Sequence, residues 1–187
     1  MRIISGIFRG KKILEPNDSK TRPLKDLVKE SIFNIIKHSN KFNVNLSESN
    51  ILDLYSGVGS FGIECLSRGA KKVIFVENYK GVLPILKKNL IKTELIDNFK
   101  IIEKDIYNDK NLFNFDLEFD IIFLDPPYKD KNLNEIFLNI KENKSLKKNG
   151  IIILHRHKKD KDYLPEFANV LEEKNYGISK IFFLKIY

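Results

Sequence analysis

One segment of the sequence joins a buried-strand pattern to residues suited to amine chemistry. The strand-like run Asp120–Leu124, which is apolar from Ile121 onward, leads directly into Asp125, Pro126, Pro127 and Tyr128. An aromatic amine is a poor nucleophile because its lone pair is delocalised into the ring, and acceptors such as the Asp125 carboxylate and the Pro126 carbonyl would localise that lone pair. Two prolines fix φ and remove competing N–H donors, while Tyr128 could stack on an extruded base for about 1–3 kcal/mol. We therefore predict that these four residues are catalytic: Asp125, Pro126, Pro127 and Tyr128.

A glycine-rich turn provides a second candidate site. Gly57, Gly59 and Gly62 satisfy the spacing G-x-G-x-x-G, follow a strand-like run and open a helix-like segment. Glycines in this position let the backbone approach a ligand and let the helix pack on the strand. Glu77 ends the next strand 20 residues after Gly57, where its carboxylate could accept the hydroxyl hydrogens of a ribose.

The glycine pattern alone also fits an NAD-dependent oxidoreductase. Asp53 argues against that alternative, because it lies on the strand just ahead of the glycines and would repel a pyrophosphate. The same carboxylate suits a ligand that carries an ammonium and a sulfonium charge, as S-adenosylmethionine does. The separate motif at Asp125 also points away from hydride transfer.

Composition limits the classes of protein that need to be considered. The 187 residues fit one domain, and their formal net charge of +8 favours a polyanionic partner, although a lysine-rich composition could produce the same balance. We see no signal peptide and no apolar run long enough to span a membrane, so we expect a cytoplasmic protein. A single cysteine, Cys65, excludes an internal disulfide, and with only three histidines we expect no metal site.

The order of the predicted elements indicates an α/β domain with a mostly parallel sheet and helices on both faces. Strands are expected over 51–55, 72–77, 99–103, 119–124 and 151–155, with helices over 61–68, 82–95 and 133–146. The tail, 170–174 and 180–186, is expected to form a hairpin. A helix over 25–38 with an apolar stripe should pack against this core.

The first 45 residues differ in character from the rest, so we divide the single domain into an N-terminal extension and helix (1–45) and a catalytic core (46–187). The basic residues of the extension and one near the fifth strand are candidate RNA contacts, although a solvated edge would look similar. They are Arg2, Arg9, Lys11, Lys12, Arg22 and Arg156. We interpret Glu64 as a charge on the helix surface and Cys65 as an inert buried thiol.

Taken together, these motifs resemble the RsmD family of bacterial 16S ribosomal RNA (guanine(966)-N2) methyltransferases over nearly the whole chain. The resemblance is carried by the opening 2–12, by 21–23 with 28–35, by the loop and helix 52–70, by 76–78, and by 124–128, which is similar to the amino-methyltransferase signature Asp/Asn-Pro-Pro-aromatic. Tyr55-Ser56 stands where relatives often have Phe-Ala. The resemblance implies a class I S-adenosylmethionine-dependent methyltransferase (Rossmann-like) fold, a seven-stranded sheet in the order 3-2-1-4-5-7-6 with strand 7 antiparallel.

The resemblance also assigns roles to residues. It implies that Glu77 binds the ribose, that Asp105 faces the adenine amine and that Ile106 contacts the ring. The whole expected cofactor-binding set is Asp53, Tyr55, Ser56, Gly57, Gly59, Glu77, Asn78, Asp105 and Ile106. An aspartate at a strand end is often a helix cap, which is the alternative for Asp105.

The resemblance implies methylation of the exocyclic N2 amine of a guanine in 16S rRNA, either as naked RNA or within the assembled small subunit. A DNA adenine-N6 methyltransferase would use the same chemistry but usually carries an added recognition region. A protein glutamine methyltransferase typically has Asn in place of Asp125, and a non-catalytic RNA-binding module would not need the motif at all. A monomer is the default expectation for the oligomeric state.

Overall fold

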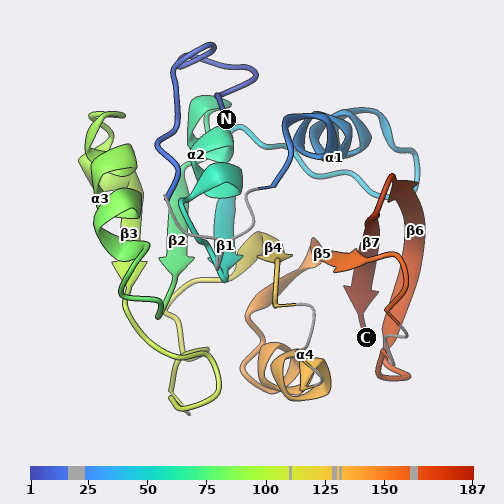
Figure 1. Cartoon of the computed structure of the whole chain (residues 1–187). Coiled ribbons are helices and arrows are strands. Elements are labelled where there is room, and N and C mark those ends of the chain that lie inside the picture. Colours follow the sequence, from blue (N-terminus) through green and yellow to red (C-terminus); the bar gives the residue numbers. More distant parts are fainter. Residues whose placement is uncertain (17–23, 110, 128–129, 131, 161–163) are drawn as a thin grey trace.

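The computed structural model describes residues 1–16, 24–109, 111–127, 130, 132–160 and 164–187. Seven strands form one sheet in the order β3-β2-β1-β4-β5-β7-β6 (Figure 1), which confirms the predicted order. All neighbours pair in parallel except β7, which is antiparallel to both β5 and β6. The strands are β1 (Asn50–Leu54), β2 (Lys72–Val76), β3 (Phe99–Ile102), β4 (Phe119–Leu124), β5 (Leu146–His157), β6 (Ala168–Tyr176) and β7 (Ser179–Ile186).

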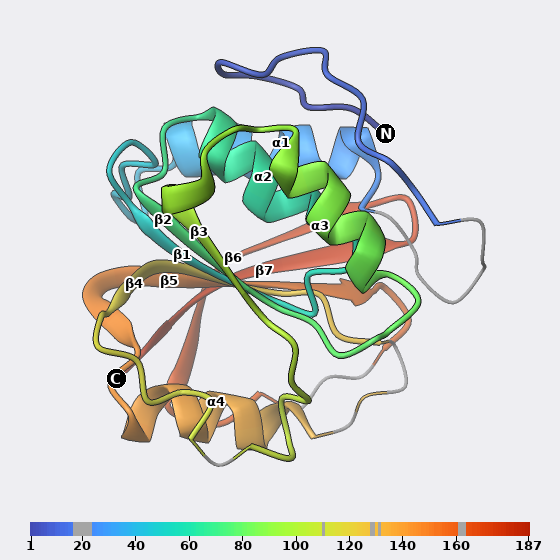
Figure 2. The same cartoon turned by 90° about the vertical axis from the view of Figure 1, so that its left-hand side faces the viewer.

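Helices cover both faces of the sheet, as the alternation of elements predicts. Helices α1 (Asp26–His38), α2 (Ser60–Ser67) and α3 (Leu83–Ile91) lie on one face and α4 (Leu133–Glu142) on the other (Figure 2). The 3₁₀ turn η1 (Ile96–Asn98) precedes β3. Successive strand residues point to opposite faces, so Ile51 and Leu52 belong to two different hydrophobic clusters. None of the helices in the described part of the chain is long and apolar enough to cross a membrane.

Two predicted helices are shorter than expected. The helix predicted to reach residue 95 ends at Ile91, where a turn leads to Glu94 with φ of 60°. The helix predicted over 133–146 ends at Glu142, because Lys144 adopts φ of 51° and Leu146 already pairs with Phe119 of β4. The fifth strand therefore starts at Leu146, five residues before Ile151, and its pairing with β4 is irregular at first. The polar residues 147–149 do not fit the apolar pattern of a buried strand, so the sequence did not predict this earlier start.

The parallel register aligns the residues that follow the strands. The last ladder pairs are Val76 with Ile102, Leu54 with Val76, Leu54 with Leu124, and Leu124 with Leu154. The next residues along β2, β1, β4 and β5 are Glu77, Tyr55, Asp125 and His155. These four residues consequently form one row across the carboxyl edge of the sheet, where open α/β folds bind their ligands.

The first residues of the chain form a short antiparallel hairpin over α2. Arg2 and Lys12 make an isolated antiparallel bridge, and Ile3, Phe8 and Ile13 join the same hydrophobic cluster as α1 and α2. This hairpin is the dark blue segment that lies over α2 in Figure 1. All eight residues of α2 are buried as a result, so the N-terminal extension and the catalytic core share one core.

Candidate active site

A cavity of about 1250 Å³ opens at the carboxyl edge of the sheet. It is lined by nearly all the residues predicted to bind the cofactor or to catalyse, although these come from separate segments of the chain. The lining includes Asp53, Tyr55, Ser56, Gly57, Glu77, Asn78, Asp105, Ile106, Asp125, Pro126 and Pro127. Gly59 precedes α2 as its N-cap and is not among the lining residues, and Tyr128 lies outside the described residues.

Asp53 is a buried carboxylate on β1, on the face that α2 covers. Its Oδ2 accepts a hydrogen bond of 3.0 Å from the backbone N–H of Gly62, so the helix start holds the side chain in place. Burial raises the pKa of Asp53 well above its usual range, and the nearby carboxylates of Asp125 and Glu77 act in the same direction. No ion pair found within the described residues involves Asp53. A cationic group placed in the cavity would offset this unfavourable electrostatic environment.

Glu77 is fixed by three backbone N–H groups. Its Oε2 accepts from Gly57 at 2.7 Å, and its Oε1 accepts from Asn78 at 2.9 Å and from Tyr79 at 2.8 Å. A carboxylate offers about four acceptor positions, so Oε2 retains capacity for a further donor. The site therefore presents one oriented acceptor oxygen between the glycine turn and β2.

Asp105 closes the neighbouring side of the cavity. Its Oδ1 accepts from the backbone N–H of Tyr107 at 2.9 Å, and its Oδ2 accepts from Asn78 Nδ2 at 2.6 Å. The first contact is a local turn two residues ahead and not a helix cap, which decides against that alternative. Ile106 is buried and also faces the cavity, so the polar pair and an apolar side chain lie next to each other.

A tyrosine–aspartate cluster joins two walls of the cavity. The Tyr55 hydroxyl donates to Asp130 Oδ2 at 2.8 Å, and the Tyr107 hydroxyl lies 2.7–2.8 Å from both Asp130 oxygens. Burial raises the pKa of Tyr55 and also that of Tyr107, and the hydrogen bond to the Asp130 carboxylate acts in the same direction on each. Both phenols are therefore neutral donors, and they tie the segment after β4 to the turn after β1.

Asp125 lies at the end of β4 and contacts β5 and β1. Its Oδ1 is 2.8 Å from His155 Nδ1, and its backbone N–H lies 3.4 Å from the carbonyl oxygen of Leu54. The Nε2 of His155 is 2.9 Å from the hydroxyl oxygen of Ser179, the first residue of β7. Asp125, His155 and Ser179 all line the cavity, so a chain of polar groups runs from the site into the antiparallel part of the sheet.

Arg156 does not fit its predicted role as an RNA contact. Its side chain is buried, with 3 % of the residue exposed, and the guanidinium donates to the carbonyl oxygens of Pro127 at 3.1 Å and Asp130 at 3.2 Å. A guanidinium committed to these carbonyls is not available to phosphate, so we remove Arg156 from the RNA-binding set. Its position on β5 instead places it under the loop that follows Asp125.

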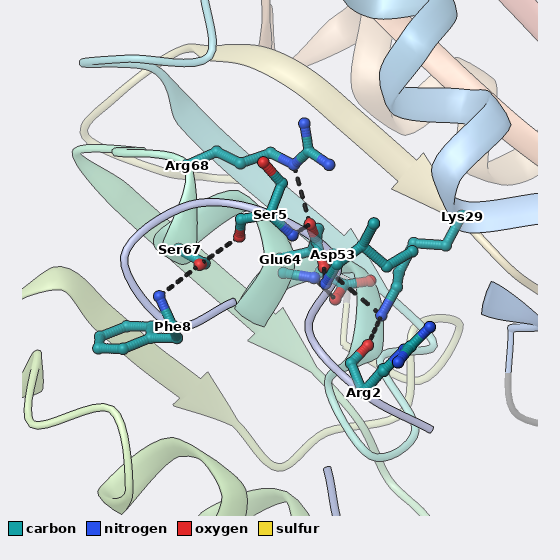
Figure 3. Close-up of polar contacts among 10 residues, drawn as sticks. Arg2, Ser5, Phe8, Lys29, Asp53, Glu64, Ser67 and Arg68 are labelled. Carbon is teal, nitrogen blue, oxygen red and sulfur yellow. Dashed lines mark hydrogen bonds and ion pairs between the residues drawn. The ribbon is translucent and has the colours of Figure 1, made fainter. Parts of the chain in front are cut away.

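The prediction that Glu64 is a helix-surface charge is wrong. The carboxylate is fully buried beneath the N-terminal hairpin, where it accepts from the backbone N–H groups of Ile4 at 2.8 Å and Ser5 at 2.9 Å and from Arg68 Nε at 2.9 Å (Figure 3). Lys29 Nζ lies 3.6 Å away and donates to the Arg2 carbonyl at 2.7 Å. Burial lowers the pKa of Lys29, and the Glu64 carboxylate opposes that shift. The cluster fastens the hairpin to α1 and α2.

The remaining predicted RNA contacts occupy the hairpin. Arg2, Arg9, Lys11 and Lys12 are all exposed, and Lys11 Nζ lies 4.7 Å from the centre of the Phe8 ring. Arg22 lies outside the described residues. The hairpin also carries an exposed apolar residue, Ile7, which is 72 % exposed.

Several cavity residues were not predicted from the sequence as parts of the site. His155 and Ser179 come from β5 and β7, Tyr107 and Asp130 from loops, and Ile178 from the β6–β7 turn. His155 follows Leu154 as Asp125 follows Leu124, and this equivalence was the available signal. Cys65, predicted to be an inert buried thiol, is fully buried, and burial raises its pKa.

The donor and acceptor set fits S-adenosylmethionine. The hydroxyl oxygen of Ser60 is buried at the start of α2, lines the cavity and has no hydrogen-bond partner among the described residues. It could donate to the carboxylate of the methionine moiety, beside Asp53 for the ammonium. The Glu77 and Asp105 carboxylates lie farther along the same cavity, in positions suited to ribose hydroxyls and an adenine amine.

Comparisons with known proteins place the chain among methyltransferases. The family model described as "Conserved hypothetical protein 95" matches residues 1–185. Ribosomal RNA small subunit methyltransferase D of Haemophilus influenzae is 35% identical over 95% of this chain and 90% of its own, and the putative rRNA methyltransferase YlbH of Bacillus subtilis is 33% identical over 97% and 96%. The crystal structure of a putative methylase from Haemophilus influenzae superposes with a TM-score of 0.74 at 32% identity, covering 98% of this chain and 96% of its own.

The order of the strands also indicates a methyltransferase fold. The antiparallel β7 between β5 and β6 distinguishes this sheet from the dinucleotide-binding order 3-2-1-4-5-6. The fold is that of class I S-adenosylmethionine-dependent methyltransferases. Together with the family match over residues 1–185, these findings show that the chain belongs to the family of conserved hypothetical protein 95, the RsmD family that its motifs resemble.

Proposed function

We propose that this protein transfers a methyl group from S-adenosylmethionine to the exocyclic N2 amine of a guanine in 16S rRNA of the small ribosomal subunit. The observation that carries the proposal is the position of Asp125, which faces the same cavity as Asp53 and Glu77 and lies beside them at one edge of the sheet. The curated relatives named above are rRNA methyltransferases, which supports RNA as the substrate class.

The cofactor half of the cavity is formed by β1, β2 and the loop after β3. S-adenosylmethionine supplies an electrophilic methyl group on a positively charged sulfur. Asp53 and Ser60 would hold the ends of its methionine moiety, Glu77 one or more ribose hydroxyls, and Asp105 with Ile106 the adenine. Asp53 contributes most to selectivity for a cation, since a buried carboxylate is stabilised by a positive ligand and destabilised by an anionic one.

The chemical step requires a more nucleophilic amine nitrogen. As the nitrogen lone pair forms the bond to the methyl carbon, the carbon–sulfur bond breaks with its electrons on sulfur, and one proton leaves the nitrogen. The Asp125 carboxylate and the Pro126 carbonyl would accept hydrogen bonds from the two N–H groups of the amine. These bonds would localise the nitrogen lone pair, and the carboxylate would offer an acceptor for the departing proton. Tyr128 is proposed to stack on the base beside Pro127.

The target base is proposed to enter the cavity beside Asp125. The cavity lining includes the apolar residues Leu24, Phe123 and Ile178, and Ile178 is 45 % exposed at the turn between β6 and β7. A flipped base would exchange water for contact with these side chains. The basic hairpin residues Arg2, Arg9, Lys11 and Lys12, with Arg22, are proposed to hold the surrounding RNA through its phosphates.

The proposal is tested with tritiated S-adenosylmethionine and small ribosomal subunits that lack this modification, followed by nucleoside analysis of the digested RNA. The wild-type protein should place label in N2-methylguanosine, and Asp125→Ala should lower the rate by roughly 10²–10⁴-fold. Asp116→Asn, which changes an exposed carboxylate before β4, is the matched control and should retain full activity.

Each alternative result has a distinct meaning. Label in N6-methyladenosine would preserve the chemistry and overturn the base. Label in naked 16S rRNA but not in the subunit would identify the free RNA as the substrate. Absence of both labelling and cofactor binding would contradict the methyltransferase function itself.

A further inference from the structure

His155 is placed beside Asp125 by the register of two parallel strands. Leu124 of β4 pairs with Leu154 of β5, so the next residue on each strand is Asp125 and His155. The imidazole is largely buried, with 8 % of its side chain exposed, and its Nδ1 is 2.8 Å from Asp125 Oδ1. The contact therefore joins a residue of β5 to the residue that directly follows β4.

Ser179 holds the other side of the imidazole. Its hydroxyl oxygen is 2.9 Å from His155 Nε2, and both residues are buried. A serine hydroxyl that donates to Nε2 selects the tautomer with the proton on Nδ1, because one nitrogen of a neutral imidazole donates and the other accepts. In that tautomer, Nδ1–H donates to Asp125 Oδ1.

The two carboxylate oxygens of Asp125 differ in their hydrogen bonding. Oδ1 is occupied by the imidazole, while no described residue donates to Oδ2. A carboxylate that can rotate about its terminal torsion presents its oxygens in a broad range of directions. Anchoring Oδ1 narrows that range and leaves Oδ2 available to a bound substrate, since Asp125 lines the cavity.

We propose that His155, supported by Ser179, is a positioning residue that orients the Asp125 carboxylate so that Oδ2 accepts an N–H of the target amine. This inference rests on the proposed function, in which Asp125 is the acceptor. It assigns the antiparallel strand β7 a part in the site, since Ser179 is its first residue. His155 does not touch the reacting atoms.

The test compares variants that retain or remove the donor to Asp125. His155→Leu fills the position with an apolar side chain that has no hydrogen-bond donor. His155→Asn offers an amide N–H near the position of Nδ1. The measurements are the single-turnover methylation rate on unmodified small subunits, the affinity for S-adenosylhomocysteine by calorimetry, and the melting temperature. His157→Leu is the matched control, because it changes the same residue type two positions along β5, outside the cavity lining.

We expect His155→Leu to lower the single-turnover rate by roughly 10- to 100-fold with cofactor affinity unchanged, since small misplacement of a reacting group has effects of this size. His155→Asn should recover most of that rate. Combining His155→Leu with Asp125→Ala should lower the rate no further than Asp125→Ala alone, because both act through one group.

Three results would overturn the inference. One is a His155→Leu protein with the wild-type rate, and another is a folded His155→Asn protein as slow as His155→Leu. If both variants fail to fold, Ser179→Ala decides: the inference requires a rate several-fold below wild type, and an unchanged rate contradicts it. Because the wild-type protein is assayed in parallel, its failure to methylate any RNA would instead contradict the proposed function.

Discussion

The guanidinium of Arg156 donates to the carbonyl oxygen of Pro127 at 3.1 Å, so a buried cation on β5 supports the proline turn that follows Asp125 from beneath. The same group donates to the Asp130 carbonyl at 3.2 Å and lies 3.7 Å from the Asp160 carboxylate. Arg156 thus contacts the backbone at Pro127 and at Asp130. The first of these contacts joins residues that are 29 positions apart in the sequence.

This contact predicts that Arg156→Lys, which keeps the charge but loses the planar fork, will slow methylation roughly tenfold and lower the free energy of unfolding by about 1.5–3 kcal/mol. RNA affinity and its salt dependence should stay at wild-type values. The rate assay, urea unfolding and a binding titration at several salt concentrations check these points. A reduced salt slope would mean that Arg156 touches RNA after all; Lys158→Ala, an exposed change nearby, is the control.

The raised pKa of Asp53 predicts a pH-dependent stability of opposite sign to that of a paired carboxylate. Below the unfolded value near 3.8 the group is protonated in both states. As pH rises above that value, the unfolded carboxyl ionises first, so this group makes the folded state progressively less stable up to its folded pKa. Asp53→Asn should therefore be more stable than wild type at neutral pH, and thermal unfolding across the pH range should show the difference vanishing near about pH 3.

The same carboxylate predicts that cofactor affinity increases with pH. Binding of a cationic ligand requires the ionised form, so wild-type affinity for S-adenosylmethionine should fall as pH drops through the raised pKa of Asp53. Asp53→Asn should bind more weakly and show a flatter profile. Calorimetry between about pH 5 and 9 measures both, and equal profiles for the two proteins would contradict the role of Asp53.

Two glycines of the G-x-G-x-x-G pattern should respond differently to alanine. A Cβ at Gly62 would lie 2.3 Å from Phe75 Cε1 and 2.9 Å from Asp53 Oδ2, so Gly62→Ala should be strongly destabilising and should weaken cofactor binding. A Cβ at Gly57 would meet nothing within 4 Å, and its φ of 55° should destabilise the alanine variant by only about 1 kcal/mol. Thermal unfolding of the two variants checks the contrast, which similar losses of stability would contradict.

The buried cluster around Glu64 predicts that Glu64→Gln will loosen the N-terminal hairpin. Removing one partner of a buried ion pair typically lowers the free energy of unfolding by about 3–5 kcal/mol. Hydrogen exchange of the Ile4 and Ser5 amides, which donate to Glu64, should accelerate in the variant. Glu103→Gln, which removes an exposed partner of Lys87, should change stability by less than about 1 kcal/mol.

The hairpin should contribute to RNA affinity mainly through charge. Arg9→Ala combined with Lys12→Ala is expected to weaken binding at low salt and to reduce the slope of log affinity against log salt by roughly 0.7–0.9 for each phosphate that the variant no longer neutralises. Lys88→Ala with Lys92→Ala removes the same charge from exposed positions at the end of α3. If both double variants reduce the slope equally, the effect belongs to net charge and not to the hairpin.

The sequence by itself, with the family resemblance of its motifs, determined the strand order, the glycine turn and the cofactor acids Asp53, Glu77 and Asp105 as candidates. The strand order and the role of Asp105 are what the family resemblance implies. The glycine turn, Asp53 and Glu77 depend on local patterns, because apolar runs define strands and residues at the carboxyl ends of parallel strands must meet at one edge. The same logic predicts that Asp125 lies at that edge. The sequence predicted too long a helix before β5, because the positive φ that Lys144 adopts after α4 has no distinctive sequence signal.

Only the tertiary structure decided the partners of charged side chains. Glu64 resembles a surface residue within its helix, yet a hairpin from the start of the chain covers it. Arg156 resembles an exposed basic residue in the sequence, yet its guanidinium is buried against the carbonyl oxygen of Pro127. The contact of His155 with Asp125 depends on the pairing of β5 with β4, and the contact with Ser179 depends on the antiparallel return of β7. Burial and hydrogen bonding between segments far apart in sequence depend on packing, and local composition does not encode them.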